Sequence, residues 1–455
     1  MQVICKNFGE NVLIEFKVKN YGPFRDEVLF SMVASNYDKT TFEDGNVVKI
    51  PKFDLRLLKS AAIYGSNASG KTQFVNALNF VNHFVTSGGR GKNKLADIPR
   101  FRLDDVSDTM PTELSVTFLH NGKIFEYGFA LGNDLVTAEW LFVWITNRRT
   151  IIFQRDINGL QKPVSKHFKV GNTIDKAKQV KGWNLYLTKA FEFEQPGNEL
   201  ILEVKSWFEG LRSISGNDPS GYETFTYENL VDPTTREKIL EFIKNADFTL
   251  EDVIVNKFKE ERILSEPEND DPRNVELYRT LQRAFELLPE RTVLEVKTKY
   301  KRSKHDGSFE YVEFTHAEES EGTKKFIAIA GPVLDILSRG GILIVDELDT
   351  KLHPLLLQRI IDQFHSTLSN PNNAQLIFNS HNTTPMGQMR RDQIWFTKKD
   401  RLGVSTLDPL SNYKYGPRKE ENLEERYLDG RFGGIPFLGR FGSKPDKFST
   451  LSTTD

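Results

Sequence analysis

The segment GSNASGKT, from Gly65 to Thr72, has the spacing G-x-x-x-x-G-K-[ST] of a phosphate-binding loop. Glycines let successive backbone N–H groups turn toward an anion, and the N-terminus of a following helix adds a partial positive charge. In this pattern Lys71 reaches the β- and γ-phosphates of a nucleotide, and the Thr72 hydroxyl takes one position on Mg²⁺. A chance glycine-rich turn is the alternative. The predicted phosphate-binding residues are Gly65, Ser66, Asn67, Ala68, Ser69, Gly70, Lys71 and Thr72.

A second candidate lies in GGILIVDELD, residues 340–349, where an apolar run ends in Asp346 and Glu347. Continuous apolar residues are typical of a strand buried on both faces of a parallel sheet, whose carboxyl end lies at the ligand-binding edge. There Asp346 is placed to hold the Mg²⁺ shell through water, and Glu347 to polarise an attacking water. An ordinary strand followed by an acidic turn is the alternative.

A third segment, EESEGTKKFIAIAGPVLDIL, places Ser320 and Gly322 at the start of a predicted helix. Ser320 is a typical N-cap, and a capped helix start rich in serine and glycine can bind an anion. A plain capped helix would explain the same residues. Pro332 lies inside this segment, and an internal proline is expected to kink or restart the helix.

A fourth polar group follows the predicted strand 376–378, which leads into Asn379, Ser380 and His381. An imidazole at the carboxyl end of a strand can hydrogen-bond a terminal phosphate and sense its loss, although a lone histidine is more often structural. The interval between Glu347 and His381 has room for one helix and one more strand of the same sheet.

Strands and helices must bring these segments together. Residues 60–64 are predicted to form a buried strand, and the helix after the loop has an apolar stripe. The stripe consists of Phe74, Val75, Leu78, Val81 and Val85. Residues 112–131 predict a hairpin around Asn121-Gly122.

Helical periodicity marks the middle of the chain, and strands return before the third segment. The predicted helices are 199–211, 235–245 and 274–288, and the predicted strands are 291–300 and 308–315. The fold class is therefore α/β, a discontinuous mixed-sheet head with a largely helical insertion. The predicted domains are 1–145 for the N-terminal half of the head, 146–290 for the insertion, 291–410 for the C-terminal half and 411–455 for a tail rich in glycine and aromatic residues.

Composition narrows the class of protein. The chain has 455 residues, 38% of them hydrophobic, and its formal net charge of −2 gives no overall attraction to nucleic acid or acidic membranes. Cys5 is the single cysteine, which excludes an internal disulfide and fits a reducing compartment. Neither a signal peptide nor an apolar stretch of membrane-spanning length is visible, so a soluble, cytoplasmic protein without a membrane partner is expected.

In their order along the chain, GSNASGKT, S-E-G-T, ILIVDE and the strand ending in Ser380-His381 resemble the ATP-binding cassette (ABC) heads of the SMC, RecF and OLD-type ATPases. The sequence is more closely similar to the AbiLi-like ATP-binding proteins of bacterial abortive infection. Stretches that fit this closer group are LIEFKVKNYGPFRDEVLFSMVAS at 13–35, LLKSAAIYGSNASGKT at 57–72, ELDTKLHPLLLQRIID at 347–362 and YLDGRFGGIPFL at 427–438.

The resemblance implies a P-loop ABC-type ATPase head that uses ATP and Mg²⁺, with each site made by two chains. Ser320 and Gly322 would cap the γ-phosphate held by the other protomer. Asp349 would cross the same interface, and His381 would be the switch histidine. A homodimer or a higher homo-oligomer joined through ATP-bridged heads is therefore expected, with slow hydrolysis that switches assembly.

The sequence departs from the family pattern in two places. No Q-loop glutamine can be placed between the phosphate loop and the insertion, because Gln73 follows the loop too closely. SEGT also replaces the LSGGQ of transporters. The chain after His381 is too short for the nuclease domain of OLD proteins, so a separate effector protein, a toxin or a nuclease, is expected. Residues 432–441 either dock a partner or pack on the head.

Three functions stay open. The first is a sensor or scaffold of anti-phage defence that controls the effector and is triggered by DNA or a phage protein. The second is an SMC/RecF-like repair or chromosome-associated ATPase that closes on DNA, and the third is a nucleotide-binding regulator without effective hydrolysis. Two basic stretches either contact nucleic acid or are solvated surface. They are Lys166, Lys169, Lys176, Lys178 and Lys181, and Lys297, Lys299, Lys301, Arg302 and Lys304, of which alternation puts Lys297, Lys299 and Lys301 on one face.

Overall fold

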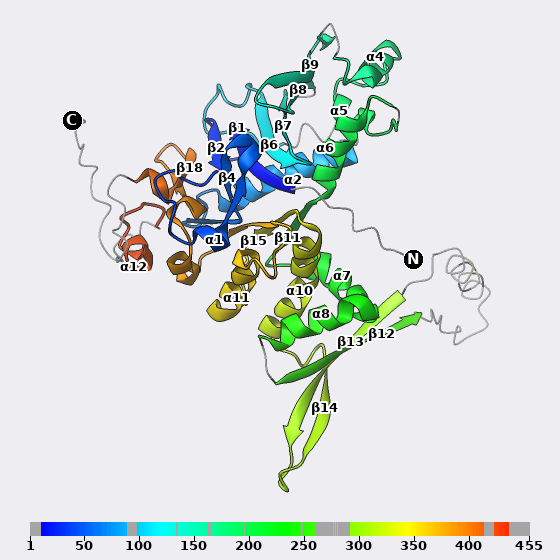
Figure 1. Cartoon of the computed structure of the whole chain (residues 1–455), viewed down its shortest axis with the longest axis vertical. Coiled ribbons are helices and arrows are strands. Elements are labelled where there is room, and N and C mark those ends of the chain that lie inside the picture. Colours follow the sequence, from blue (N-terminus) through cyan, green and yellow to red (C-terminus); the bar gives the residue numbers. More distant parts are fainter. Residues whose placement is uncertain are drawn as a thin grey trace.

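The computed structural model describes residues 11–88, 98–132, 135–161, 165–194, 196–246, 249–259, 276, 278, 280, 292–413 and 423–435. Two large sheets form the body of the protein, and a group of helices with a third sheet extends from it (Figure 1). The α/β architecture expected from the sequence is confirmed.

A six-stranded sheet positions the candidate residues. Its strands, in spatial order, are β11 (Leu211–Ser215), β15 (Ile342–Asp346), β16 (Gln375–Asn379), β5 (Ser60–Gly65), β17 (Ile394–Lys399) and β18 (Ser405–Pro409). The first five strands are parallel, and β18 is antiparallel to β17. Strands β5 and β16 are buried at every residue, as expected for central strands covered on both faces. The strands predicted at 60–64 and 376–378 are confirmed.

The second large sheet is antiparallel throughout. Its spatial order is β10 (Gly159–Leu160), β9 (Arg149–Asp156), β8 (Val136–Trp144), β7 (Lys123–Leu131), β6 (Thr112–His120), β1 (Asn11–Lys19) and β2 (Val28–Ser31). Asn121 and Gly122 have φ values of 47° and 66°, which suit the left-handed turn that joins β6 to β7. The predicted hairpin is therefore confirmed. A small separate sheet consists of β3 (Val47–Ile50) and β4 (Leu55–Leu58).

Helix α2 (Lys71–Ser87) contacts both large sheets. The Phe74 ring lies 5.4 Å from Phe16 of β1 and 5.2 Å from Phe30 of β2, measured between ring centroids. The whole apolar stripe predicted for this helix is buried. Helices α4 (Lys169–Lys176), α5 (Tyr186–Ala190) and α6 (Glu199–Glu209) follow the antiparallel sheet (Figure 1). The direction of α2, which sets the phosphate loop, is thus fixed by apolar packing.

Helices α7 (Ser220–Val231), α8 (Pro233–Lys244) and α10 (Glu321–Arg339) pack against one another. They carry the three-stranded antiparallel sheet of β12 (Leu250–Lys259), β13 (Thr292–Ser303) and β14 (Phe309–Thr315). Figure 1 shows this sheet at the far end of the helical group from the body. The strands predicted at 291–300 and 308–315 are confirmed as β13 and β14.

Pro332 does not interrupt α10, contrary to the prediction, since the helix runs unbroken from Glu321 to Arg339. Proline removes the N–H that would bond the carbonyl of Ala328, four residues earlier. The hydroxyl of Thr226, on α7, donates to that carbonyl instead and accepts from the Gly331 N–H at 3.2 Å. Because a neighbouring helix supplies the missing donor, the proline is tolerated.

The remaining elements complete the body of the protein. They are α1 (Glu43–Asn46), α11 (Pro354–His365), α12 (Leu423–Leu428) and the 3₁₀ turns at Pro51–Phe53, Thr384–Gln388, Arg391–Gln393 and Leu410–Asn412. Phe432 is buried, and its ring centroid lies 5.4 Å from that of Phe396 in β17. The described part of the segment 432–441 therefore packs on the head, and residues 436–441 lie outside the described residues.

Residues 146–290 contain strands of both large sheets as well as helices. Strands β9 and β10 continue the antiparallel sheet, and β11 is an edge strand of the parallel sheet. The half-polar sequence of β11, LRSIS, gives little strand signal by itself. Helices α6 and α8 agree with the helices predicted at 199–211 and 235–245, whereas 274–288 lies outside the described residues except for helical 276, 278 and 280. None of the described helices is long and apolar enough to cross a membrane.

Gln375 at the start of β16 ties the two large sheets together. It is fully buried, and its Oε1 accepts from the Leu13 N–H at 2.7 Å. Its Nε2 donates to the Leu13 carbonyl at 3.2 Å and to the Leu58 carbonyl at 2.8 Å. One amide thus satisfies three buried backbone groups of β1 and β4.

We predict that Gln375→Leu, which keeps the volume of the side chain, lowers the free energy of unfolding by about 2–4 kcal/mol because it leaves these groups without partners. Urea unfolding of wild type and variant measures the change. Gln179→Leu replaces an exposed glutamine and should change stability by less than about 0.5 kcal/mol. Equal effects of the two substitutions would contradict the role given to Gln375.

Candidate functional site

Three of the predicted segments begin at the ends of adjacent parallel strands. β15, β16 and β5 are neighbours in the sheet, in that order. Parallel strands have their carboxyl ends at one edge. The acidic residues after β15, His381 after β16 and the phosphate loop after β5 therefore lie at the same edge of the sheet.

The phosphate loop has the backbone conformation of an anion-binding turn. Gly65, Ala68 and Gly70 have positive φ values of 154°, 60° and 110°, and α2 begins directly after Gly70. The Ser69 hydroxyl donates to the Ser66 carbonyl at 2.7 Å. Asn67 and Ala68 are exposed at the top of the loop, while Ser69, Gly70 and Lys71 are buried. The loop is therefore internally braced and open on one side.

Lys71 places an ammonium group at the centre of this edge. Its Nζ donates to the carbonyls of Gly65 and Ser66 at 2.8 and 3.1 Å. Burial lowers the pKa of Lys71 below its usual value, and the nearby carboxylates of Glu347, Asp349 and Asp346 oppose that shift. The structure thus brings the lysine and all three acidic residues together.

Asp346 is held by two hydrogen bonds. Thr72 and Asn379 both donate to its carboxylate. Burial raises the pKa of the Asp346 carboxyl, and these two hydrogen bonds act in the opposite direction. The Thr72 hydroxyl and an aspartate oxygen side by side are the hard oxygen ligands that Mg²⁺ prefers.

Asn379 is a site residue that the sequence analysis did not assign. Its amide nitrogen donates to Asp346 Oδ1, and its amide oxygen accepts from the Glu347 N–H. The side chain is fully buried. The one sequence signal was its position between a buried strand and Ser380-His381. Asn379 therefore orients both acidic residues from the next strand.

Glu347 lies in a constrained turn with a φ of 55°, a region that non-glycine residues rarely adopt. Gly216 packs directly against this turn, where a Cβ would collide with the Glu347 carbonyl oxygen. The Glu347 carboxylate accepts from Asn217 Nδ2 at 2.6 Å and from the Thr350 hydroxyl at 3.3 Å. Asn217 was also missed, because nothing in the sequence around it marks the end of β11.

Asp349 contacts the segment that contains the predicted switch histidine. Its Oδ2 accepts from the backbone N–H groups of His381 and Asn382, both at 3.1 Å. Its Oδ1 is buried without a hydrogen-bond partner among the described residues. The His381 side chain is exposed. The structure therefore joins Asp349 to His381 within one chain.

Ser320 and Gly322 lie at the N-terminus of α10, as predicted. The Ser320 Oγ accepts from the Thr323 N–H at 3.1 Å, which confirms the N-cap. Gly322 packs against the Lys351 carbonyl oxygen, 2.9 Å from where a Cβ would lie. No hydrogen bond between described residues joins Ser320 or Gly322 to residues 65–72. These two candidate anion-binding segments are therefore not joined by a hydrogen bond within the described part of the chain.

Lys325 links α10 to the acidic turn and is a third residue that the sequence analysis missed. Its buried Nζ donates to the carbonyls of Leu348 and Thr350 at 3.0 and 2.5 Å, and lies 3.3 Å from that of Glu347. Burial lowers the pKa of Lys325 to about 8. A movement of α10 would therefore be transmitted to the turn after β15.

The donor set fits a magnesium–nucleotide complex and does not fit a metal cage. The described residues contain no group of three or more His, Cys, Asp or Glu side chains suited to a metal ion. Mg²⁺ usually takes one or two protein oxygens and fills its shell with water and phosphate oxygens. Thr72 and Asp346 supply such a pair beside the phosphate loop.

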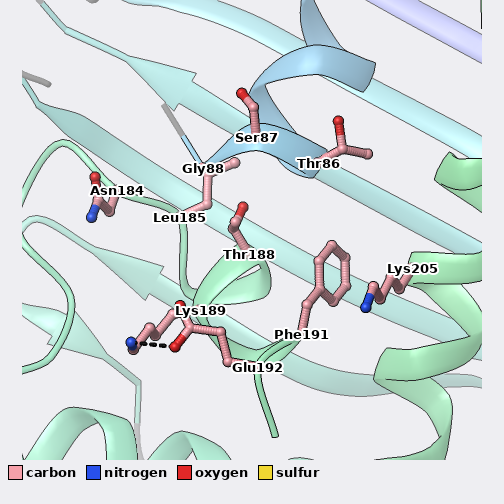
Figure 2. A pocket seen from close by; sticks show the side chains of 10 residues that line it. All are labelled: Thr86, Ser87, Gly88, Asn184, Leu185, Thr188, Lys189, Phe191, Glu192 and Lys205. Carbon is pink, nitrogen blue, oxygen red and sulfur yellow. Dashed lines mark hydrogen bonds and ion pairs between the residues drawn. The ribbon is translucent and has the colours of Figure 1, made fainter. Parts of the chain in front are cut away.

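A separate hollow of about 470 Å³ lies at the other end of α2. Figure 2 shows it between Thr86 and Ser87 of α2 and residues of α5 and α6, with an ion pair of 2.5 Å between Lys189 and Glu192 at its rim. It contains none of the predicted site residues. The hollow is therefore distinct from the edge where the phosphate loop and the carboxylates meet.

A family model described as "AAA domain, putative AbiEii toxin, Type IV TA system" matches residues 60–384. This match begins at β5 and ends just after His381, so it includes every site residue described above. The chain belongs to this AAA-domain family. No curated protein matches the chain. The family assignment makes the protein a P-loop ATPase, and nucleotide binding follows from it.

In this AAA domain, we predict that Asn379→Leu weakens Mg²⁺-dependent nucleotide binding about tenfold to a hundredfold, because Asp346 and the Glu347 turn lose their common support. Titration with a fluorescent ATP analogue, with Mg²⁺ and with EDTA, measures the effect. Asn372→Leu is the matched control, since Asn372 donates to Ser338 at 2.7 Å near the opposite end of β16. A similar loss in both variants would mean that Asn379 has no specific role.

Proposed function

We propose that the protein binds and slowly hydrolyses ATP between paired heads, in the manner of ABC-type ATPases. ATP then switches assembly. In this proposal the assembled form is the sensor or scaffold of a bacterial abortive-infection system and controls a separate toxin or nuclease. Homodimers or higher homo-oligomers form through the nucleotides.

The single observation that supports pairing is that no hydrogen bond between described residues joins the two candidate anion-binding segments of one chain. Residues 65–72 lie beside the carboxylates, whereas Ser320 caps a helix whose start is exposed and packs against Lys351. A helix N-terminus attracts a phosphate group. In a twofold dimer each nucleotide contacts the loop of one protomer and Ser320 and Gly322 of its partner, so that both segments are used once per site.

Each residue at the edge then has a defined role. Lys71 neutralises the β- and γ-phosphates, and Thr72 and Asp346 hold Mg²⁺. Glu347 polarises water, and Asn217 fixes the Glu347 carboxylate. Asn217 lies at the junction between β11 and α7, within residues 146–290. Because no Q-loop glutamine can be placed between the phosphate loop and the insertion, we propose that Asn217 couples the head to the helical group instead.

His381 and Asp349 report the state of the nucleotide to the interface. The exposed His381 imidazole can hydrogen-bond a γ-phosphate, while Asp349 holds the backbone of the same segment. Loss of the phosphate would therefore change the contacts of His381, whose backbone N–H is bonded to Asp349. We place Asp349 at the contact with the partner protomer.

The role in defence is supported by two likenesses. The description of the family names a toxin of a type IV toxin–antitoxin system, and the sequence resembles AbiLi-like proteins. The alternative, a DNA-repair or chromosome-associated ATPase that closes on DNA, is supported by the lysines on one face of β13. A regulator without hydrolysis is supported by the bonds that engage the Glu347 carboxylate. ATPase assays separate this last function from the first two.

We predict that Lys71→Ala abolishes ATP binding, and that Glu347→Gln retains ATP, loses hydrolysis and accumulates as the assembled form. The reason is that the first change removes the cation that faces the phosphates, and the second removes the carboxylate that polarises water. Light scattering with and without ATP measures the assembly, and phosphate release measures hydrolysis. Normal hydrolysis by Glu347→Gln would show that Glu347 does not activate water.

A mixing experiment tests whether two chains build each site. Lys71→Ala damages the loop, and Ser320→Glu places a carboxylate where a γ-phosphate would bind, so each variant alone should be inactive. In a mixture, half of the dimers contain both variants, and each of these has one intact site, so about a quarter of wild-type activity should return. Each variant mixed with itself is the control. A mixture as inactive as its components would place the whole site in one chain.

A further inference from the structure

The hairpin of β13 and β14 is largely exposed. Figure 1 shows it extending away from the helical group. Val253, Val296 and Thr298 are buried at its base, where the sheet packs on the helices. Residues 301–309, which include its tip, are all exposed. The hairpin is therefore anchored at one end and open to solvent at the other.

Its two faces differ in chemistry. Tyr300 and Arg302 point to one face by strand alternation, and Lys297, Lys299 and Lys301 point to the other. The pairing of Lys301 with Tyr311, and of Ser303 with Phe309, adds two aromatic rings to the lysine face. We call the group Lys299, Lys301, Phe309 and Tyr311 the aromatic–lysine strip.

The rings and ammonium groups of the strip lie close together. Lys299 Nζ is 4.5 Å from the centre of the Tyr311 ring, and Lys301 Nζ is 4.1 Å from that of Phe309. Phe309 is 61% exposed and Tyr311 is 59% exposed, so neither ring belongs to a hydrophobic core. Large apolar rings held at a projecting surface are typical of contact sites.

The lysines of the strip differ in their acidic neighbours, since Asp252 of β12 and Glu313 of β14 pair in register with Lys299, whereas Tyr311 pairs with Lys301. On the opposite face Arg302 and Lys304 both pair with Glu310, at 3.5 and 3.1 Å. Near the base, Lys297 lies 3.7 Å from Glu295 and 3.9 Å from Glu313. Neither Lys299 nor Lys301 forms an ion pair with any described residue. The outer end of this face, at Lys301, is therefore positive, and the carboxylates opposite Lys299 limit that charge on the side of the base.

We propose that the aromatic–lysine strip binds single-stranded nucleic acid without regard to sequence. Positive groups beside exposed aromatic rings match the phosphates and the unstacked bases of a single strand. Phe309 and Tyr311 are two residues apart on one strand, about 7 Å along it, so they can stack on neighbouring bases. A duplex hides its base faces, and an acidic peptide would use the lysines without the rings.

The strip is close in sequence to the start of α10. β14 ends at Thr315, and Glu318 accepts from the Thr315 N–H at 2.8 Å. The Thr298 hydroxyl of β13 donates to Glu319, directly before Ser320. A strand bound here would lie next to the segment that leads into α10. The binding itself is independent of the proposed function, because it is measured without ATP.

The test uses the full-length protein and fluorescence anisotropy with labelled oligothymidylate and oligouridylate of about 20 nucleotides, longer than a typical site of this kind. Wild type should bind at least one of the two, and their ratio of affinities tells whether DNA or RNA is preferred. Phe309→Ala/Tyr311→Ala should weaken binding about tenfold or more, because two stacking surfaces are lost. Lys299→Ala/Lys301→Ala should weaken it and reduce the salt slope by about 1.4, since each phosphate contact contributes about 0.7.

Two matched variants serve as controls. Arg302→Ala removes one positive charge from the opposite face, and Tyr37→Ala removes a fully exposed ring far from the hairpin in sequence. Both should bind like wild type, and circular dichroism checks that all variants are folded. The proposal is overturned by absence of binding to either oligonucleotide, by tighter binding of the corresponding duplex, or by unchanged affinity when the two rings are removed. Failure here leaves the mixing experiment unaffected, so the two proposals are judged separately.

Discussion

The structure depends on keeping one buried ammonium group and three carboxylates together at a single edge of a sheet. Burial alone lowers the pKa of Lys71 and raises that of Asp346, so each group would be less charged without the other. Parallel pairing of β15, β16 and β5 supplies the geometry, since it holds the ends of three strands in register. The two sheets, α2 and the Gln375 bonds all serve to hold that register.

The parts of this edge that rest on local pattern could be predicted from the sequence. The phosphate loop, the acidic end of β15 and the Ser320 cap follow from spacing and from propensity within a few residues. Asn379, Asn217 and Lys325 act through partners distant in sequence, and an isolated asparagine or lysine has no pattern that predicts such a partner. The effect of Pro332 could not be predicted from the sequence for the same reason, because its tolerance in α10 depends on the Thr226 hydroxyl of α7. Similarly, β11 is a strand only because β15 offers it an edge.

Helix α10 connects the separate parts of the molecule. Its N-terminus presents Ser320, and Lys325 one turn further holds the carbonyls of the acidic turn. Its middle contacts α7 through Thr226, and α7 follows Asn217, which bonds Glu347. Two routes therefore lead from this helix to the same glutamate. A displacement of α10 would therefore change the support of Glu347 from both sides.

The hairpin of β13 and β14 is a third element connected to the start of α10. Its base is bonded to Glu318 and Glu319, so the orientation of β13 and β14 and the start of α10 are not independent. A ligand can shift an equilibrium only by as much as it prefers one state. Single-stranded nucleic acid bound to the aromatic–lysine strip would therefore influence ATP-dependent pairing only if pairing changes the conformation of the hairpin. The hydrogen bonds of Glu318 and Glu319 would transmit such a change. Reciprocity then requires that ATP alter the affinity for the strand by the same factor.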